Sequence, residues 1–231
     1  MNENFFIVGK SSVNFCEPDS YIYGIGEPWN VLSSLIIVFF GLYGLYNTNY
    51  RFNRLDNELV SFNKTQLNIL YGLLSCIGLG SMFFHAKLSP FAHWVDIIFI
   101  SMMLVYSQYI LSEQKNLLIN KLKYIGLLTI HFITSINIPH IHIFLLFGTG
   151  FIIKKSIENK IKFNYLTESQ LNDKLQKKYQ LIKKYFFIGL LFWIIDYLGC
   201  IFIYPYHVHW IFHILIGYVS YKIINLTKYF Y

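Results

Sequence analysis

The chain is poor in charge: 13% of its 231 residues are charged, against about 25% in a typical soluble domain. That shortage excludes a disordered chain, a basic nucleic-acid-binding domain and an ordinary soluble enzyme. We also expect no cleavable signal peptide, because the first ten residues are mixed and the first apolar run begins near Trp29. The sequence shows no internal repeat and no second domain, so we expect one membrane domain over residues 1–231.

Apolar residues take the place of the missing charge. They make up 55% of the sequence, 19% of the residues are aromatic, and the mean hydropathy is +0.44. They form long runs separated by short polar breaks, and lipid offers no partner for unpaired backbone groups. We therefore predict an all-α integral membrane protein, a seven-transmembrane helix bundle. The predicted spans are residues 29–46, 67–85, 94–111, 124–136, 138–153, 185–204 and 207–226. The fourth and fifth are shorter than the roughly 20 residues of a usual span, which leaves open a single re-entrant hairpin around Ile138.

The formal charge of +7 is distributed unevenly over the two sides of the predicted bundle. Of the 19 Lys and Arg residues, only Lys10 and Lys87 fall on the side of the N-terminus, and the other 17 fall on the opposite side. The positive-inside rule then places the N-terminal segment 1–28 outside the cytoplasm, and the C-terminus and a basic loop over residues 154–184 inside it. Within that loop, residues 171–179 have the pattern of a short basic amphipathic helix. The basic residues therefore indicate a multi-pass orientation in a lipid bilayer and no nucleic-acid partner. Nothing in the sequence indicates an obligate protein partner.

Polar residues inside predicted spans are costly, so each is a candidate functional residue. His209 and His213 are four residues apart and share one helix face, and the same spacing places Ser81 and His85 together. Asp96 follows about one turn into the third span. The predicted topology brings all five residues to the same end of the bundle, on the non-cytoplasmic side.

Three histidines with a water molecule are the ligand set of a catalytic zinc site, in which the pKa of the water falls to about 7. An aspartate such as Asp96 would accept the proton of that water, and a hydroxyl such as that of Ser81 would stabilise an oxyanion. The alternative is that these histidines are ordinary helix ends in contact with water. We expect the remaining histidines to lie outside the site: His93, His131, His140, His142 and His207.

Four segments resemble motifs of the alkaline ceramidases and their bacterial relatives, within a seven-helix hydrolase superfamily that includes adiponectin-type receptors. The stretch G-S-M-F-F-H-A-K-L at residues 80–88, followed by Asp96, is similar to the motif G-S-x-x-[FY]-H-x-x-L…D. H-W-I-F-H-I-L-I-G at residues 209–217 resembles H-x-x-x-H-I-L-x-G. E-P-W-N-V-L-S-S-L at residues 27–35 and F-W-I-I-D at residues 192–196 resemble E-P-x-N-x-x-S-[SN]-L and F-W-x-x-D.

The resemblance implies a zinc-dependent amidohydrolase that cleaves ceramide, or a related N-acyl sphingolipid, to a sphingoid base and a fatty acid. It makes His85, His209 and His213 the zinc ligands. It assigns Ser81 to the oxyanion or to orienting the water, and Asp96 to positioning and deprotonating the water. The animal enzymes have Glu-Leu-Pro after this aspartate, whereas here Ile-Ile-Phe follows, so the chain is nearer to bacterial or divergent members. The corresponding location is an ER or Golgi-type membrane in a eukaryote and the cell membrane in a bacterium.

A receptor-like or lipid-binding protein with a structural metal and no turnover is the alternative function. Ser81 and Asp96 beside the ligands favour the enzyme, because a purely structural site can fill its fourth position with protein. A transporter or channel more often shows repeated halves or broken helices, and the sequence shows neither.

The resemblance extends to an N-terminal stretch that binds calcium in the animal enzymes. It would supply carboxylates, an asparagine carbonyl and a backbone oxygen, which are ligands that calcium prefers. These residues are Asn14, Phe15, Glu17, Asp19 and Glu27. Asn14 replaces an aspartate of the family motif, and the spacing to Glu27 differs. A polar cap on the first helix is the alternative, and the sequence leaves both open.

Two further features lie toward the non-cytoplasmic side. Asp196 either orients a zinc-ligand histidine or closes a structural hydrogen-bond network. Cys16 and Cys200 lie where oxidation is allowed, which suggests a disulfide between them.

Overall fold

The computed structural model of the chain describes residues 15–18, 24–52, 58–112, 117–137, 139–165, 169–199, 202 and 207–230. Within these ranges every regular element is a helix, which confirms the predicted all-α fold class. The helices are α1 (Pro28–Phe52), α2 (Glu58–Lys87), α3 (Pro90–Leu111), α4 (Leu117–Asn137), α5 (Pro139–Tyr165), α6 (Ser169–Leu198) and α8 (His209–Thr227).

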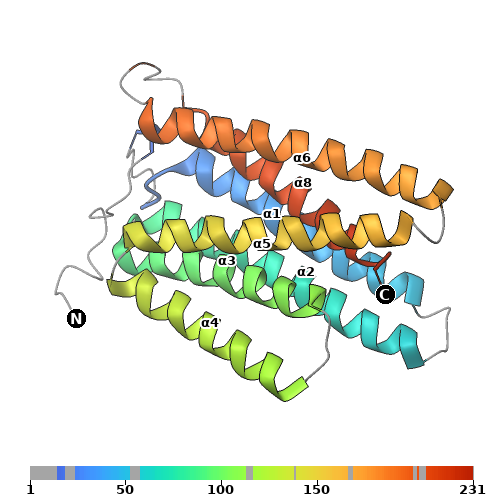
Figure 1. The fold of residues 1–231 in the computed structure, drawn as a ribbon. Coiled ribbons are helices and arrows are strands. Elements are labelled where there is room, and N and C mark those ends of the chain that lie inside the picture. The colour runs from blue at the N-terminus through green and yellow to red at the C-terminus, as the bar shows by residue number, and fades with distance from the viewer. Residues whose placement is uncertain are drawn as a thin grey trace.

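Contacts between the helices close a ring (Figure 1). In order around the ring, α1 packs on α2, α2 on α3, α3 on α5, α5 on α6, α6 on α8, and α8 on α1 again. The helix α4 lies outside this ring against α3 and α5, at the lower edge of the view in Figure 1. In addition, α2 contacts α8 across the ring. This contact joins the two helices that carry the three candidate zinc ligands.

Small residues let neighbouring helices approach closely. A Cβ atom added at Gly78 would lie 2.6 Å from the backbone nitrogen of Val38 and 3.0 Å from the carbonyl oxygen of Ser34, so α1 and α2 touch backbone to backbone. A Cβ atom at Gly80 would lie 3.1 Å from the Cα atom of Asp96 on α3. Close packing through small residues is typical of membrane helices, which have no hydrophobic driving force between them in lipid.

The outer faces of the bundle carry large apolar side chains. Phe39 on α1 is 60% exposed, Phe144 on α5 is 76% exposed and Phe187 on α6 is 59% exposed. Large exposed apolar surfaces are rare on soluble proteins. In the described part of the chain, three helical segments are long and apolar enough to cross a membrane. They are Pro28–Asn49, Lys64–Lys87 and Pro90–Leu111. These features point to a membrane protein.

The helices are longer than several of the predicted spans. α4 has 21 residues and α5 has 27, where we predicted 13 and 16. At 1.5 Å per residue α4 is about 31 Å long, which is the thickness of the hydrocarbon core. α6 ends at Leu198, before the predicted end at residue 204.

The prediction of a loop over residues 154–184 is wrong for the residues that the structure describes there. α5 continues to Tyr165, and α6 already begins at Ser169, so residues 171–179 belong to α6 and form no separate helix. The reason is that Ile157, Leu175 and Tyr179 form a buried apolar cluster between these helix extensions. Lysines on the opposite faces, such as Lys177 and Lys184, are exposed.

Candidate metal centre

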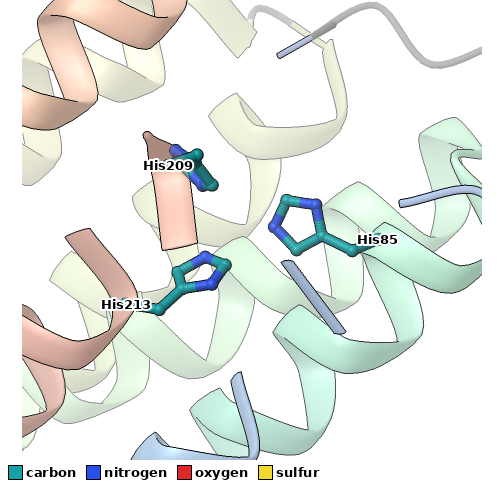
Figure 2. A group of neighbouring side chains, drawn as sticks. All are labelled: His85, His209 and His213. Carbon is teal, nitrogen blue, oxygen red and sulfur yellow. The ribbon is translucent and has the colours of Figure 1, made fainter. Parts of the chain in front are cut away.

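His85, His209 and His213 converge in the interior of the bundle. His85 lies in the last turn of α2, and the other two occupy the first two turns of α8. Their exposed fractions are 1%, 2% and 3%, and one ring nitrogen from each residue lies within 4.8 Å of the other two. Figure 2 shows the three rings turned toward one another. The predicted convergence of the three histidines is therefore confirmed.

The donor set fits a divalent transition metal. Nitrogens bound to one tetrahedral zinc ion at about 2.1 Å lie about 3.4 Å apart, so small ring rotations would bring these three into position. Nδ1 of His209 is buried and, within the described ranges, has no hydrogen-bond partner. A buried nitrogen without a partner is costly, and a metal ligand role would satisfy a ring nitrogen of this residue.

Glu27 orients the ring of His85. Its Oε2 lies 2.5 Å from Nδ1 of His85, and both side chains are buried. The side-chain amide of Asn30 donates to the same carboxylate oxygen at 3.0 Å. Burial raises the pKa of Glu27 to about 7. With Nδ1 of His85 held by a carboxylate, its Nε2 is the nitrogen left for a metal, which is the usual arrangement around zinc-binding histidines.

Two serines of α1 orient the ring of His213 in the same way. The hydroxyls of Ser33 and Ser34 donate to the carbonyl oxygen of Asn30 at 3.1 and 2.7 Å. Their oxygens are therefore acceptors for Nδ1–H of His213, at 2.8 Å from Ser33 and 3.3 Å from Ser34. This leaves Nε2 of His213 without a proton and available to a metal.

Ser81 contacts one of the candidate metal ligands, whereas no contact of Asp96 with the three histidines is found among the described residues. Oγ of Ser81 is 3.4 Å from Nε2 of His213 and 3.0 Å from Oγ of Ser34. Asp96 faces Gly80, the residue before Ser81, across the contact of α2 with α3. Its Oδ1 is buried and has no hydrogen-bond partner among the described residues. The catalytic role of both residues stays a prediction.

Asp196 lies in a buried hydrogen-bond network, and both roles that the sequence left open for it stay predictions. Its carboxylate accepts hydrogen bonds from the backbone N–H groups of Cys16, Val208 and His209. The thiol of Cys16 donates to the carbonyl oxygen of Asp196 at 3.0 Å. Cys200 lies outside the described residues, so its disulfide with Cys16, which would remove this S–H donor, stays a prediction.

Of the predicted calcium ligands, Phe15, Glu17 and Glu27 are described, and Asn14 and Asp19 lie outside the described residues. The carboxylate of Glu17 accepts hydrogen bonds from the backbone N–H groups of Trp29 at 2.7 Å and Asn30 at 2.9 Å. Burial raises the pKa of Glu17. The contacts of Glu17 are those of a cap on α1, the alternative role for this stretch. The calcium site stays a prediction.

The sequence reasoning missed the parts played by Asn30, Ser33 and Ser34. With Glu27 they recur at spacings of three and four residues, which places them on one face of α1. That polar stripe on an apolar helix was a signal for residues that face a polar site.

His131 and His142 form a second buried polar group. Nδ1 of His131 lies 3.1 Å from Nε2 of His142. Hydroxyls extend the group, since Ser101 contacts Nε2 of His142 and Thr149 contacts Nε2 of His131, both at 3.1 Å. These residues connect α3, α4 and α5 and are not part of the metal-ligand set.

Comparison with known proteins adds one finding. The family model described as Ceramidase matches residues 8–231, which is nearly the whole chain. No curated protein matches the chain.

Proposed function

We propose that this chain, which belongs to the Ceramidase family, is a zinc-dependent membrane hydrolase that cleaves the amide bond of ceramide or a related N-acyl sphingolipid. The products are a sphingoid base and a fatty acid. The family suggests hydrolysis of the ceramide amide, and the observation that supports it in this chain is the buried group of three histidines.

His85, His209 and His213 would hold the metal through one ring nitrogen each. When bound, zinc would act as a Lewis acid and generate a nucleophile from water at neutral pH. With Nδ1–H donated to Glu27 in His85 and to the two serines of α1 in His213, each histidine would offer an unprotonated Nε2 to the metal. A three-histidine set leaves room for water and substrate, which supports an enzyme over a protein with a purely structural metal.

Ser81 and Asp96 would carry out the remaining chemistry. Ser81 lies within 3.4 Å of Nε2 of His213, so its hydroxyl is close enough to the metal to donate to the oxyanion of a lipid amide under attack. Asp96 would accept a proton from the attacking water and return it to the departing amine. Its Oδ1 has no partner among the described residues, so this oxygen is not already occupied.

The substrate would reach the site from the bilayer. A centre buried among apolar helices suits a lipid that enters sideways and places its acyl chain against apolar side chains. We further propose that all seven described helices cross the membrane, with the N-terminus outside the cytoplasm and the C-terminus inside it. The uneven distribution of lysine and arginine supports this orientation.

The test is hydrolysis of a series of N-acyl lipids by the purified protein and its variants, with zinc content measured on the same samples. We expect His213→Ala to lose zinc and activity together, because it removes a ligand. We expect Asp96→Ala to keep most of the zinc and to lose turnover by about 10²-fold or more, which is the usual contribution of a general base. His131→Ala is the control, since His131 lies in the separate polar group that connects α3, α4 and α5. A wild type that binds zinc and hydrolyses no N-acyl lipid would contradict the proposed activity and leave the receptor-like alternative.

A further inference from the structure

We propose that Asp196 is a positioning residue of the metal centre, which holds the ligand helix α8 and the N-terminal segment 15–18 together around His209. The proposal deepens the proposed function and rests on it, because it concerns how the metal ligands are held in place. It is carried by the contacts of the two carboxylate oxygens of Asp196, whose side chain is fully buried.

The first oxygen holds the start of α8. The first N–H groups of a helix have no partner within the helix, and Val208, the residue before α8, provides no side-chain cap. Oδ1 of Asp196 accepts the N–H groups of Val208 at 2.8 Å and His209 at 3.2 Å. A carboxylate at this position also interacts favourably with the positive end of the helix dipole. His209 is the first residue of α8 and His213 lies one turn later, so the same interaction fixes the position of both ligands along the axis of α8.

The second oxygen holds the N-terminal segment. Oδ2 of Asp196 accepts the N–H group of Cys16 at 3.0 Å, and the thiol of Cys16 donates to the backbone oxygen of Asp196. Cys16 is 2% exposed, so these bonds are shielded from water. The contacts join residues that are 180 positions apart in the sequence.

Holding Cys16 in place brings the neighbouring residue against a metal ligand. The ring of Phe15 stacks on that of His209 with the centroids 3.7 Å apart, and it lies 5.7 Å from the ring of His85. Glu17, on the other side of Cys16, caps α1 at Trp29 and Asn30. The carboxylate of Asp196 on α6 thus positions His209 in two ways. It binds the backbone at the start of α8, and it holds Cys16 so that the neighbouring Phe15 packs on the His209 ring.

The replacement Asp196→Asn tests this role with little change of shape. An amide has one oxygen where the carboxylate has two, so the NH₂ group must face at least one of the N–H donors. We expect the zinc affinity to fall by about 10- to 100-fold, the usual effect of losing a residue that orients metal ligands. Asp173→Asn is the matched control, because Asp173 lies on the same helix, is exposed and is distant in sequence from every ligand. Zinc affinity is measured by competition with a coloured chelator, and the visible spectrum of the Co²⁺-substituted protein reports the ligand geometry.

A merely structural role gives a different result. It would lower the melting temperature of Asp196→Asn but leave the zinc affinity and the Co²⁺ spectrum of the folded protein as in the wild type. Zinc affinity within twofold of the wild type would overturn the proposal. A wild type that binds no zinc would instead overturn the proposed function, so the two failures are distinguishable.

A measurement on the wild type covers the case in which Asp196→Asn does not fold. Residue-resolved amide hydrogen exchange should show Val208 and His209 protected, although the first amides of a helix ordinarily exchange fast. Fast exchange at both positions would overturn the proposal without any variant.

Discussion

Removing the two hydroxyls that hold His213 should weaken metal binding in a graded way. Ser33 and Ser34 both accept from Nδ1–H of His213, at 2.8 and 3.3 Å, and both are buried. In Ser33→Ala the longer contact with Ser34 remains and can shorten, whereas in the double variant Ser33→Ala/Ser34→Ala the N–H group keeps only the backbone carbonyl oxygen of Asn30 as an acceptor on α1. Ser33→Ala alone should therefore lower the zinc affinity much less than the double replacement.

The upper limit of the effect is the cost of a buried donor that is left unsatisfied. That cost is about 1–3 kcal/mol, and 1.4 kcal/mol corresponds to a factor of ten in an equilibrium constant. The ring can escape the cost by moving its proton to Nε2, but it then no longer offers that nitrogen to zinc. Because the backbone oxygen of Asn30 remains as an acceptor, we expect about tenfold weaker zinc binding in the double variant and a smaller loss in Ser33→Ala alone.

The assay is zinc affinity by chelator competition on detergent-purified protein at constant pH, with hydrolysis of an N-acyl lipid measured alongside. Ser75→Ala is the matched control, because Ser75 is a buried serine of α2 whose hydroxyl donates only within its own helix, to the carbonyl oxygen of Tyr71. Zinc affinity of the double variant within twofold of the wild type would refute the assignment of the His213 tautomer. A larger loss in Ser34→Ala than in Ser33→Ala would refute the order of the two acceptors.

Two further changes probe the packing and the N-terminal segment. Gly78→Ala should destabilise the folded protein by about 1–3 kcal/mol, because the added methyl group would lie 2.6 Å from the backbone nitrogen of Val38. Gly72→Ala on the same helix meets no atom within 4 Å and should be neutral or slightly stabilising in a thermal unfolding assay, so equal effects of the two would contradict the close contact of α1 with α2. Glu17→Gln distinguishes calcium binding from helix capping. If Glu17 binds calcium, added Ca²⁺ should raise the melting temperature of the wild type and not of the variant, whereas a cap alone predicts the same loss of stability with and without Ca²⁺.

The convergence of the three histidines could be predicted because its signals are local. The spacing of His209 and His213 fixes them on one helix face, and the order of spans places His85 at the same end of the bundle. Both statements depend only on the helical period and on the number of crossings. They needed no knowledge of how the helices are rotated about their axes.

The supporting contacts depend on that rotation and were not predicted. The bond of Cys16 to Asp196 joins residues 180 positions apart, and the contact of His131 with His142 depends on how α4 lies against α5. The spacing of residues in the sequence does not predict contacts of this kind. The role of Glu17 could not be decided from the sequence either. A carboxylate before a helix suits a cation and a helix cap equally well until its neighbours are known.

The extensions of α5 and α6 were mistaken for a loop for a different reason. Lysines dominate residues 154–184, and a charge-rich stretch between apolar spans has the composition of a loop. The apolar residues Ile157, Ile161, Leu175 and Tyr179 nevertheless recur at helical spacing, and the structure buries them between the two helices. Here the helical spacing of the apolar residues predicts the structure better than the high lysine content does.

The central claim is that one zinc ion binds to His85, His209 and His213. The most direct test is anomalous scattering at the zinc absorption edge from crystals of the wild-type protein. We predict a single peak per chain, about 2.0–2.1 Å from one nitrogen of each of the three histidines. A map without a peak among these rings, or a zinc ion bound only elsewhere, would contradict it.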